Sequence, residues 1–315
     1  MSIEITITKE YDGVKPKNFL KKKIDLPFFK IVQMIPEKRI TLNKKKIKQD
    51  DVLRTGDVIK IWPHDVKLRE VEKKFINMKN LGIDTLFENE DFLVLNKTAN
   101  ITVQGAQETD RSLSLHLAYL KNKNNDENDF EYFHAHRLDK DTSGCLVVGK
   151  TRGSVRDLNE IFRTRNVTKK YLALCVGSFD ESSGTVEIGL KRTPEGVREK
   201  MEICSLDDLE GKKSISLYKV IEEFDYDGEI LSLVEVEIKT GITHQIRMHM
   251  KYLGCPILGD KMYGNSSVNR KFEKLLDRQF LHSSNLAFEF EGKKYDFKAP
   301  LTYDLQKFMD LIKEN

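Results

Sequence analysis

The stretch FHAHRLDKDTSG, residues 133–144, concentrates two histidines, one arginine and two aspartates within a few positions. The run CLVVGK, residues 145–150, follows it directly and is short, apolar and interrupted by a glycine, which predicts a buried strand. A polar turn that leads into a buried strand gives side chains a rigid support from which to enter a cleft. We therefore expect the fold to be organised around this strand and the functional site around this turn.

Length and composition predict a globular chain with more than one domain. The 315 residues are 39% hydrophobic and 33% charged, which permits a sizeable core and argues against disorder throughout. The four cysteines lie far apart without a Cys-x-x-Cys pair, which predicts free thiols in a reducing compartment. The sequence has neither an apolar run of roughly 18 residues nor a signal-peptide pattern, so we expect a cytoplasmic protein without membrane contact.

Charge is distributed unevenly along the chain. Residues 1–62 carry 15 Lys and Arg against 8 Asp and Glu, although the net charge of the whole chain is only +3. A basic module ahead of a mildly acidic body predicts binding to a polyanion such as RNA or DNA. A lysine-rich surface that only keeps a small domain soluble is the other interpretation, and charge alone leaves both open.

By residue type alone, the polar turn at residues 133–144 has three interpretations. Its histidines and aspartates suggest a metal site, but no later ligand set with metal-binding spacing accompanies them. A hydrolase built on Ser143 and His136 would need a Gly-x-Ser-x-Gly elbow, which the sequence around Ser143 lacks. A purely structural turn, in which Asp139 and Thr142 bind backbone amides, remains the main alternative.

Three motifs carry a resemblance to a known family. Residues 136–144 read His-Arg-Leu-Asp, two variable residues and Thr-Ser-Gly, and resemble the signature of the RluA-type pseudouridine synthases. The Lys-x-Tyr-x-Ala of residues 169–173 resembles the family's second motif. The stretch TGITHQIRMH, residues 240–249, with GDKMYG behind it at 259–264, resembles the third. Ile242 stands where the family has an arginine, and the resemblance extends from about residue 12 to residue 305.

The resemblance implies that the protein isomerises uridine to pseudouridine in RNA. It gives Asp139 the role of nucleophile or initiating base. Arg247 is expected to be the charged partner that binds the Asp139 carboxylate bidentately, and Tyr171 to offer a stacking face for the detached uracil. Because the reaction is redox-neutral and the sequence shows no ligand set, no cofactor or metal is expected. The resemblance also implies substrate or RNA contacts at His136, Arg137, Lys169 and Ile246. Thr243 is predicted to cap the helix that carries Arg247.

Residues 1–62 resemble the small RNA-binding domain named after ribosomal small-subunit protein four. The specific parts are the Leu-Asn-Lys turn of residues 42–44 and the strand GDVIKI of residues 56–61. The apolar segment Pro-Phe-Phe of residues 27–29 departs from the polar segment usual there. The candidate RNA contacts are Lys30, Lys38, Arg39, Lys44, Lys45 and Lys46, each of which is also compatible with an ordinary solvated charge.

The predicted organisation is α+β, with a central mixed or antiparallel sheet in the catalytic domain. We expect an RNA-binding domain at residues 1–62, a linker at 63–82 and the catalytic domain at 83–315. The expected substrate is structured RNA, most closely large-subunit (23S) ribosomal RNA, with no protein partner and a monomeric enzyme. Residues 100–104 resemble the RluC subtype more than RluD. The rival from another class is an RNA-binding or ribosome-assembly factor without catalysis, which would not need Asp139, Tyr171 and Arg247.

Overall fold

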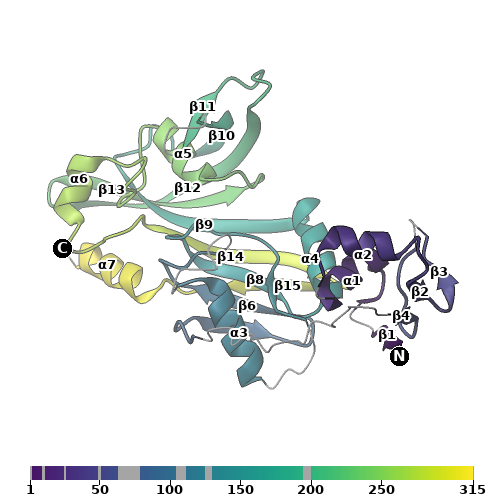
Figure 1. The fold of residues 1–315 in the computed structure, drawn as a ribbon. Helices are drawn as coiled ribbons and strands as arrows, with labels where there is room; N and C mark the ends of the chain where they lie inside the picture. The colour runs from purple at the N-terminus through teal and green to yellow at the C-terminus, as the bar shows by residue number, and fades with distance from the viewer. Residues whose placement is uncertain are drawn as a thin grey trace.

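The computed structural model describes residues 2–8, 11–24, 26–48, 51–62, 79–103, 111–124, 130–193 and 200–314. Within these ranges the strands form two sheets, a smaller one of four strands and a larger one of 11 strands (Figure 1). In the larger sheet the pairs are antiparallel except for β8 with β14, so the sheet is mixed. The predicted α+β class with a mixed central sheet is therefore confirmed. Residues 63–78 of the predicted linker and Gln104 lie outside the described residues.

The smaller sheet is built from the N-terminal residues and encloses its own apolar core. Asn43 and Lys44 have positive φ angles of 50° and 63°, as a two-residue turn between twisted antiparallel strands requires. The Asn43 amide donates to the Asp57 carboxylate at 2.7 Å and accepts the Val58 N–H at 2.8 Å. The Leu-Asn-Lys turn and the Gly-Asp strand are thus parts of a single contact. The elements are β1 (Ile3–Thr6), α1 (Pro16–Lys23), α2 (Phe28–Met34), β2 (Ile40–Leu42), β3 (Lys45–Lys46) and β4 (Val58–Ile61), in the sheet order β1-β4-β2-β3.

The larger sheet forms the body of the molecule. Its order is β11 (Met201–Cys204), β10 (Ser183–Arg192), β12 (Lys212–Tyr226), β13 (Glu229–Ile238), β9 (Val167–Val176), β14 (Leu281–Phe290), β8 (Ser143–Gly149), β6 (Phe92–Lys97) and β5 (Asp84–Glu88). β15 (Lys293–Lys298) pairs with β14, and β7 (Phe133–His134) pairs with β8. The helices are α3 (Leu113–Lys123), α4 (Arg152–Arg163), α5 (Gln245–Tyr252), α6 (Ser266–Phe272) and α7 (Tyr303–Lys313). None of the described helices is long and apolar enough to cross a membrane.

The strand predicted after the polar turn is β8, and every residue in it is buried. β8 lies between β6 and β14, so its apolar run is covered by strands on both edges. Gly144 has a φ of 109°, and a Cβ there would overlap the backbone of Ser283 where β8 and β14 run parallel. The glycine that ends the first motif is therefore required by the close approach of β14.

Different elements lie at the two ends of the larger sheet. The N-terminal elements lie beside α4, whereas β10, β11 and α5 lie towards the opposite end (Figure 1). The Arg152 guanidinium of α4 lies 4.8 Å from the centre of the Tyr11 ring, which brings the N-terminal residues against the body. α5 begins at Gln245, and its N-cap is His244 with a φ of 56°, not Thr243 as predicted. The chain enters this helix through a left-handed residue, which the capping pattern does not reveal.

The buried His249 and His282 and the half-buried His136 make stability depend on pH. Burial lowers the pKa of His136 to about 3 and the pKa values of His249 and His282 to about 4. Below pH 6.5 these histidines bind protons in the unfolded chain but stay neutral in the folded chain. The free energy of unfolding therefore falls as the pH falls. At pH 5 each of these histidines lowers the free energy of unfolding by about 2 kcal/mol relative to its value at neutral pH.

We expect the free energy of unfolding, measured in urea, to decrease steadily between pH 7 and pH 5. The His249 Nε2 is 2.8 Å from the Ser214 hydroxyl, and its Nδ1 has no hydrogen-bond partner among the described residues. A glutamine retains the donor, so His249→Gln should reduce the pH slope with little change at pH 7. An identical slope in this variant would show that His249 does not titrate as its burial requires.

Candidate active site

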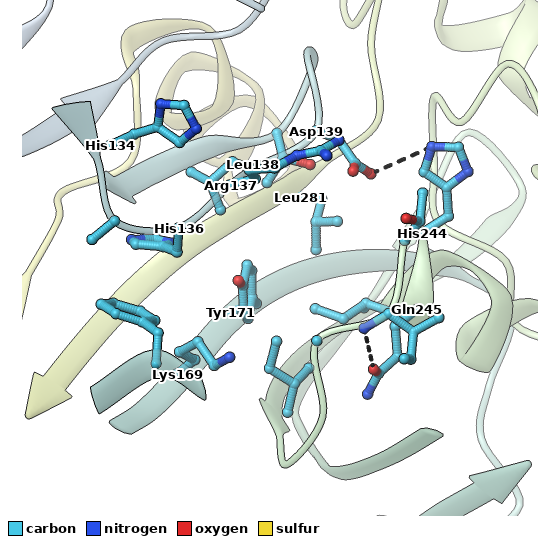
Figure 2. A pocket seen from close by; sticks show the side chains of 18 of the residues that line it. His134, His136, Arg137, Leu138, Asp139, Lys169, Tyr171, His244, Gln245 and Leu281 are labelled. Carbon is cyan, nitrogen blue, oxygen red and sulfur yellow. Dashed lines mark hydrogen bonds and ion pairs between the residues drawn. The ribbon is translucent and has the colours of Figure 1, made fainter. Parts of the chain in front are cut away.

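The loop between β7 and β8 brings Asp139 into a cavity of about 450 Å³. The opposite wall is the turn before α5, and β9 forms the floor (Figure 2). This volume lies within the range of pockets that hold small molecules or single nucleotides. All the expected catalytic and substrate residues of the body line this cavity: His136, Arg137, Asp139, Lys169, Tyr171, Ile246 and Arg247. This cavity is not lined by the N-terminal candidates, which lie among the elements of the smaller sheet: Lys30, Lys38, Arg39, Lys44, Lys45 and Lys46.

The carboxylate of Asp139 is held by one of its two oxygens. Its Oδ2 lies 3.4 Å from Nη1 of Arg247 and 3.9 Å from Nε2 of His244. Within the described part of the chain, Oδ1 has no hydrogen-bond partner. The side chain is 28% exposed, so it is reachable from the cavity. A nearby cation and an unoccupied oxygen are what a carboxylate nucleophile needs.

Arg247 is oriented by Asp260, which the sequence analysis did not assign to the site. Nε and Nη2 of Arg247 bind the two carboxylate oxygens of Asp260 at 2.7 and 2.8 Å. Burial disfavours the charged forms of both side chains. The hydrogen bonds and the attraction between the two opposite charges outweigh it, so the pKa of Arg247 is raised and that of Asp260 is lowered. The prediction that Arg247 binds Asp139 bidentately is therefore wrong, because Nε and Nη2 of Arg247 are both occupied by Asp260. Arg247 offers Asp139 only the remaining Nη1.

Tyr171 and Lys169 extend from β9 into the cavity (Figure 2). They are two residues apart on a strand, so both side chains lie on the same face. Burial raises the pKa of Tyr171 above its ordinary value and keeps the phenol protonated. Burial lowers the pKa of Lys169, whose Nζ has no ion-pair or hydrogen-bond partner among the residues that the structure describes. The floor thus offers an aromatic ring beside a donor that remains available to a ligand.

His136 supports the loop in its neutral form. Its Nε2 accepts the Val147 N–H of β8 at 3.1 Å, and its ring stacks on Phe162 with 4.5 Å between centroids. The low pKa of His136, about 3, follows from burial and fits a ring nitrogen that acts only as an acceptor. Arg137 beside it is exposed at the mouth of the cavity, whereas Ile246 is buried in the wall.

Two buried basic side chains fix the backbone around Asp139, and sequence reasoning missed both. Lys97 Nζ donates to the Lys140 carbonyl at 3.0 Å and to the carbonyls of Thr98 and Ile101. Arg278 Nη1 donates to the Asp141 carbonyl at 3.0 Å. A lysine that ends the fully buried strand β6 was a usable signal for the first of these side chains. Arg278 belongs to none of the three motifs and gave no comparable signal.

The turn before α5 is held by the side chain of Gln245. Its Oε1 accepts the Thr240 hydroxyl at 2.7 Å and the Ile242 N–H at 3.1 Å. Ile242, which departs from the family pattern, lines the active-site cavity and also an adjoining cavity of about 330 Å³ beside β10 and β11. In the described ranges no three His, Cys, Asp or Glu residues are grouped so that they could hold a metal ion.

The same part of the chain matches a known family. The family model described as RNA pseudouridylate synthase matches residues 91–252, which include Asp139, Tyr171 and Arg247. The chain therefore belongs to the RNA pseudouridylate synthase family and is an RNA pseudouridine synthase, as its motifs predict.

Particular relatives narrow the resemblance to the subtype predicted from residues 100–104. Proteins named ribosomal large subunit pseudouridine synthase C are similar over nearly the whole length. The protein from Yersinia pestis is 32% identical over 319 residues, covering 99% of this chain and 96% of the relative. The protein from Pasteurella multocida is 31% identical over 317 residues, covering 98% and 94%. Among solved structures, human RNA pseudouridylate synthase domain containing 1 is 26% identical with a TM-score of 0.58, covering 74% of this chain and 95% of that one.

Proposed function

We propose that this enzyme converts specific uridines of large-subunit (23S) ribosomal RNA into pseudouridine, with Asp139 as the nucleophile. The convergence of Asp139, Tyr171 and Arg247 on one cavity from three separate elements carries the proposal. The names of the full-length relatives supply the substrate class. The enzyme acts as a monomer in the cytoplasm, where this RNA is available to it.

The reaction breaks the bond between uracil N1 and the sugar C1′ and forms a bond between C5 and C1′. The target nucleotide leaves its stack and enters the cavity, at a cost of a few kcal/mol. Oδ1 of Asp139 then attacks the sugar or the base and starts glycosidic cleavage. The detached uracil turns and C5 attaches to C1′, and the bond that Asp139 formed to the sugar or the base breaks and returns its carboxylate. The hydrogen at C5 leaves as a proton while N1 gains one. No electron is gained or lost, so these steps need no redox cofactor.

Each neighbouring side chain has a separate part in this scheme. The ring of Tyr171 offers a stacking face for the uracil while it turns, and its phenol stays protonated. Arg247 faces the carboxylate of Asp139 with Nη1 while Asp260 fixes the guanidinium. Lys169 is an available donor on the floor for a uracil oxygen or a phosphate. Arg137, exposed at the mouth, holds the extruded nucleotide.

The N-terminal module extends the RNA contact beyond the cavity. We assign it to the ribosomal-protein-S-four type, with boundaries at residues 1–62, 63–82 and 83–315 for module, linker and catalytic domain. The Asn43–Asp57 contact and the basic turn beside it support the assignment. Its cationic candidates meet phosphates and release counterions on binding.

Replacing two of these lysines should weaken the salt dependence of binding. We expect Lys45→Gln with Lys46→Gln, both exposed on β3, to lower the slope of log affinity against log salt by about 1 to 2. A matched pair on α7, Lys307→Gln with Lys313→Gln, removes the same charge far from β3 and should leave the slope unchanged. Binding titrations at several salt concentrations measure both. Equal slopes for the two pairs would contradict phosphate contacts at β3.

Mapping pseudouridines in ribosomal RNA from cells with and without this protein tests the proposed function. We expect defined positions in the large-subunit RNA to revert to uridine, and to be restored by the unaltered gene but not by an Asp139→Asn variant. An unchanged large-subunit map would contradict the substrate class. Changes at positions typical of the RluD subtype would retain the chemistry and change the assigned targets.

A further inference from the structure

His244 has a backbone conformation that non-glycine residues seldom adopt. Its φ is 56°, in the left-handed region, at the entry to α5. A non-glycine residue held there costs free energy, and such residues gather at functional sites. This geometry places the imidazole between Tyr263 and Asp139, with the ring directed at the Asp139 carboxylate (Figure 2).

The hydrogen bonds of Tyr263 determine where the His244 ring carries its proton. The Tyr263 hydroxyl oxygen accepts the Met201 N–H at 2.8 Å, and His244 Nδ1 lies 2.9 Å from the same hydroxyl. If the hydroxyl proton is donated to Nδ1, the neutral ring holds its proton on Nε2. The opposite tautomer would direct the Nε2 lone pair at the Asp139 carboxylate, which is electrostatically unfavourable. The arrangement therefore favours an N–H that faces Asp139.

The surroundings keep this ring neutral. Burial lowers the pKa of His244, the charge of Asp139 opposes that shift, and the charge of Arg247 adds to it. The charge of Asp260 acts in the same direction as that of Asp139. A neutral donor suits this position, because it can hold a carboxylate without neutralising the charge that the nucleophile needs.

We propose that His244 is a positioning residue: its Nε2–H, oriented by Tyr263, shares Oδ2 of Asp139 with Arg247 and leaves Oδ1 to react. The inference rests on the proposed role of Asp139 as nucleophile. The Nε2–Oδ2 distance is 3.9 Å, longer than a hydrogen bond, and it closes when a uridine enters the cavity. Catalytic hydrogen bonds are commonly long in the unliganded state and tighten around substrate.

Two amide substitutions separate this donor role from a structural one. Asparagine tolerates the left-handed backbone and can reach Tyr263, but it is too short to present a donor to Asp139. Glutamine is long enough to place an amide N–H near the position of Nε2. We expect His244→Asn to lower the single-turnover rate constant on the order of 10- to 100-fold without weakening RNA binding. His244→Gln should recover most of that loss.

A double substitution tests the link to Tyr263. If Tyr263 acts by orienting His244, Tyr263→Phe should slow the unaltered enzyme more than it slows the His244→Asn variant. Thermal unfolding of each variant shows whether it is folded. A folded His244→Asn variant as fast as the unaltered enzyme, equal losses for Asn and Gln, or additive effects with Tyr263→Phe would each overturn the proposal. An active Asp139→Asn variant in the same series would instead overturn the proposed function on which it rests.

Discussion

Asp139→Asn is expected to reduce pseudouridine formation on the order of 10⁴-fold or more, to below detection. The substitution keeps the size and hydrogen-bonding shape of the side chain but removes the charge and the nucleophilic oxygen. RNA affinity should change little, because phosphate contacts dominate it. Single-turnover assays on a ribosomal RNA fragment, run beside binding titrations, measure both quantities.

Asp141→Asn is the matched control for this experiment. Asp141 is two residues further on, does not line the active-site cavity, and contacts Arg278 through its main-chain carbonyl. Its amide variant should therefore retain most of the activity. An inactive Asp141→Asn beside an active Asp139→Asn would move the nucleophile from one carboxylate to the other.

Arg247→Lys is expected to have the second largest effect, a loss of at least about 100-fold in the single-turnover rate constant. A lysine cannot bind both oxygens of Asp260 and contact Asp139 at the same time. It would leave the carboxylate of Asp260, which is 2% exposed, incompletely paired. Breaking a buried pair of this kind also destabilises a protein, by about 3–5 kcal/mol when one partner is lost entirely.

Both the single-turnover rate constant and the free energy of unfolding should be measured for this variant, because the Arg247–Asp260 pair supports both catalysis and stability. Arg270→Lys, at an exposed position on α6, is the control for the change in side-chain chemistry and should behave like the unaltered enzyme. Full activity in a folded Arg247→Lys variant would show that a single cation near Asp139 is sufficient and that the fork is dispensable.

The strands and the central cavity were predictable because their signals are local. β8 was visible as a short apolar run beside a polar turn, and the three motifs that supply Asp139, Tyr171 and Arg247 were recognisable by their resemblance to those of the family. The structure brings them to one cavity. Short apolar strands and motif spacing depend on neighbouring residues, which a sequence displays directly.

The supporting contacts were not predictable because they are long-range. Asp260 pairs with Arg247 across a turn and takes the fork that was expected to serve Asp139. Lys97, at the end of β6, and Arg278, in the segment between α6 and β14, reach the loop from far along the chain and bind main-chain carbonyls, which leave no sequence signature. The left-handed His244 was hidden for another reason: Thr243 fits the usual capping pattern, and the packing around the site overrides it.

The most direct measurement of the central claim is the release of the C5 hydrogen from uridine. The purified protein is incubated with large-subunit ribosomal RNA that carries tritium at C5 of uridine, and tritium in water is compared with pseudouridine found by nucleoside analysis. Because C5 must lose its hydrogen to bind C1′, the account predicts release equal to the pseudouridine formed. It also predicts none from Asp139→Asn at the same RNA occupancy. Failure of the unaltered enzyme to release tritium from RNA that it binds, or equal release by Asp139→Asn, would contradict it.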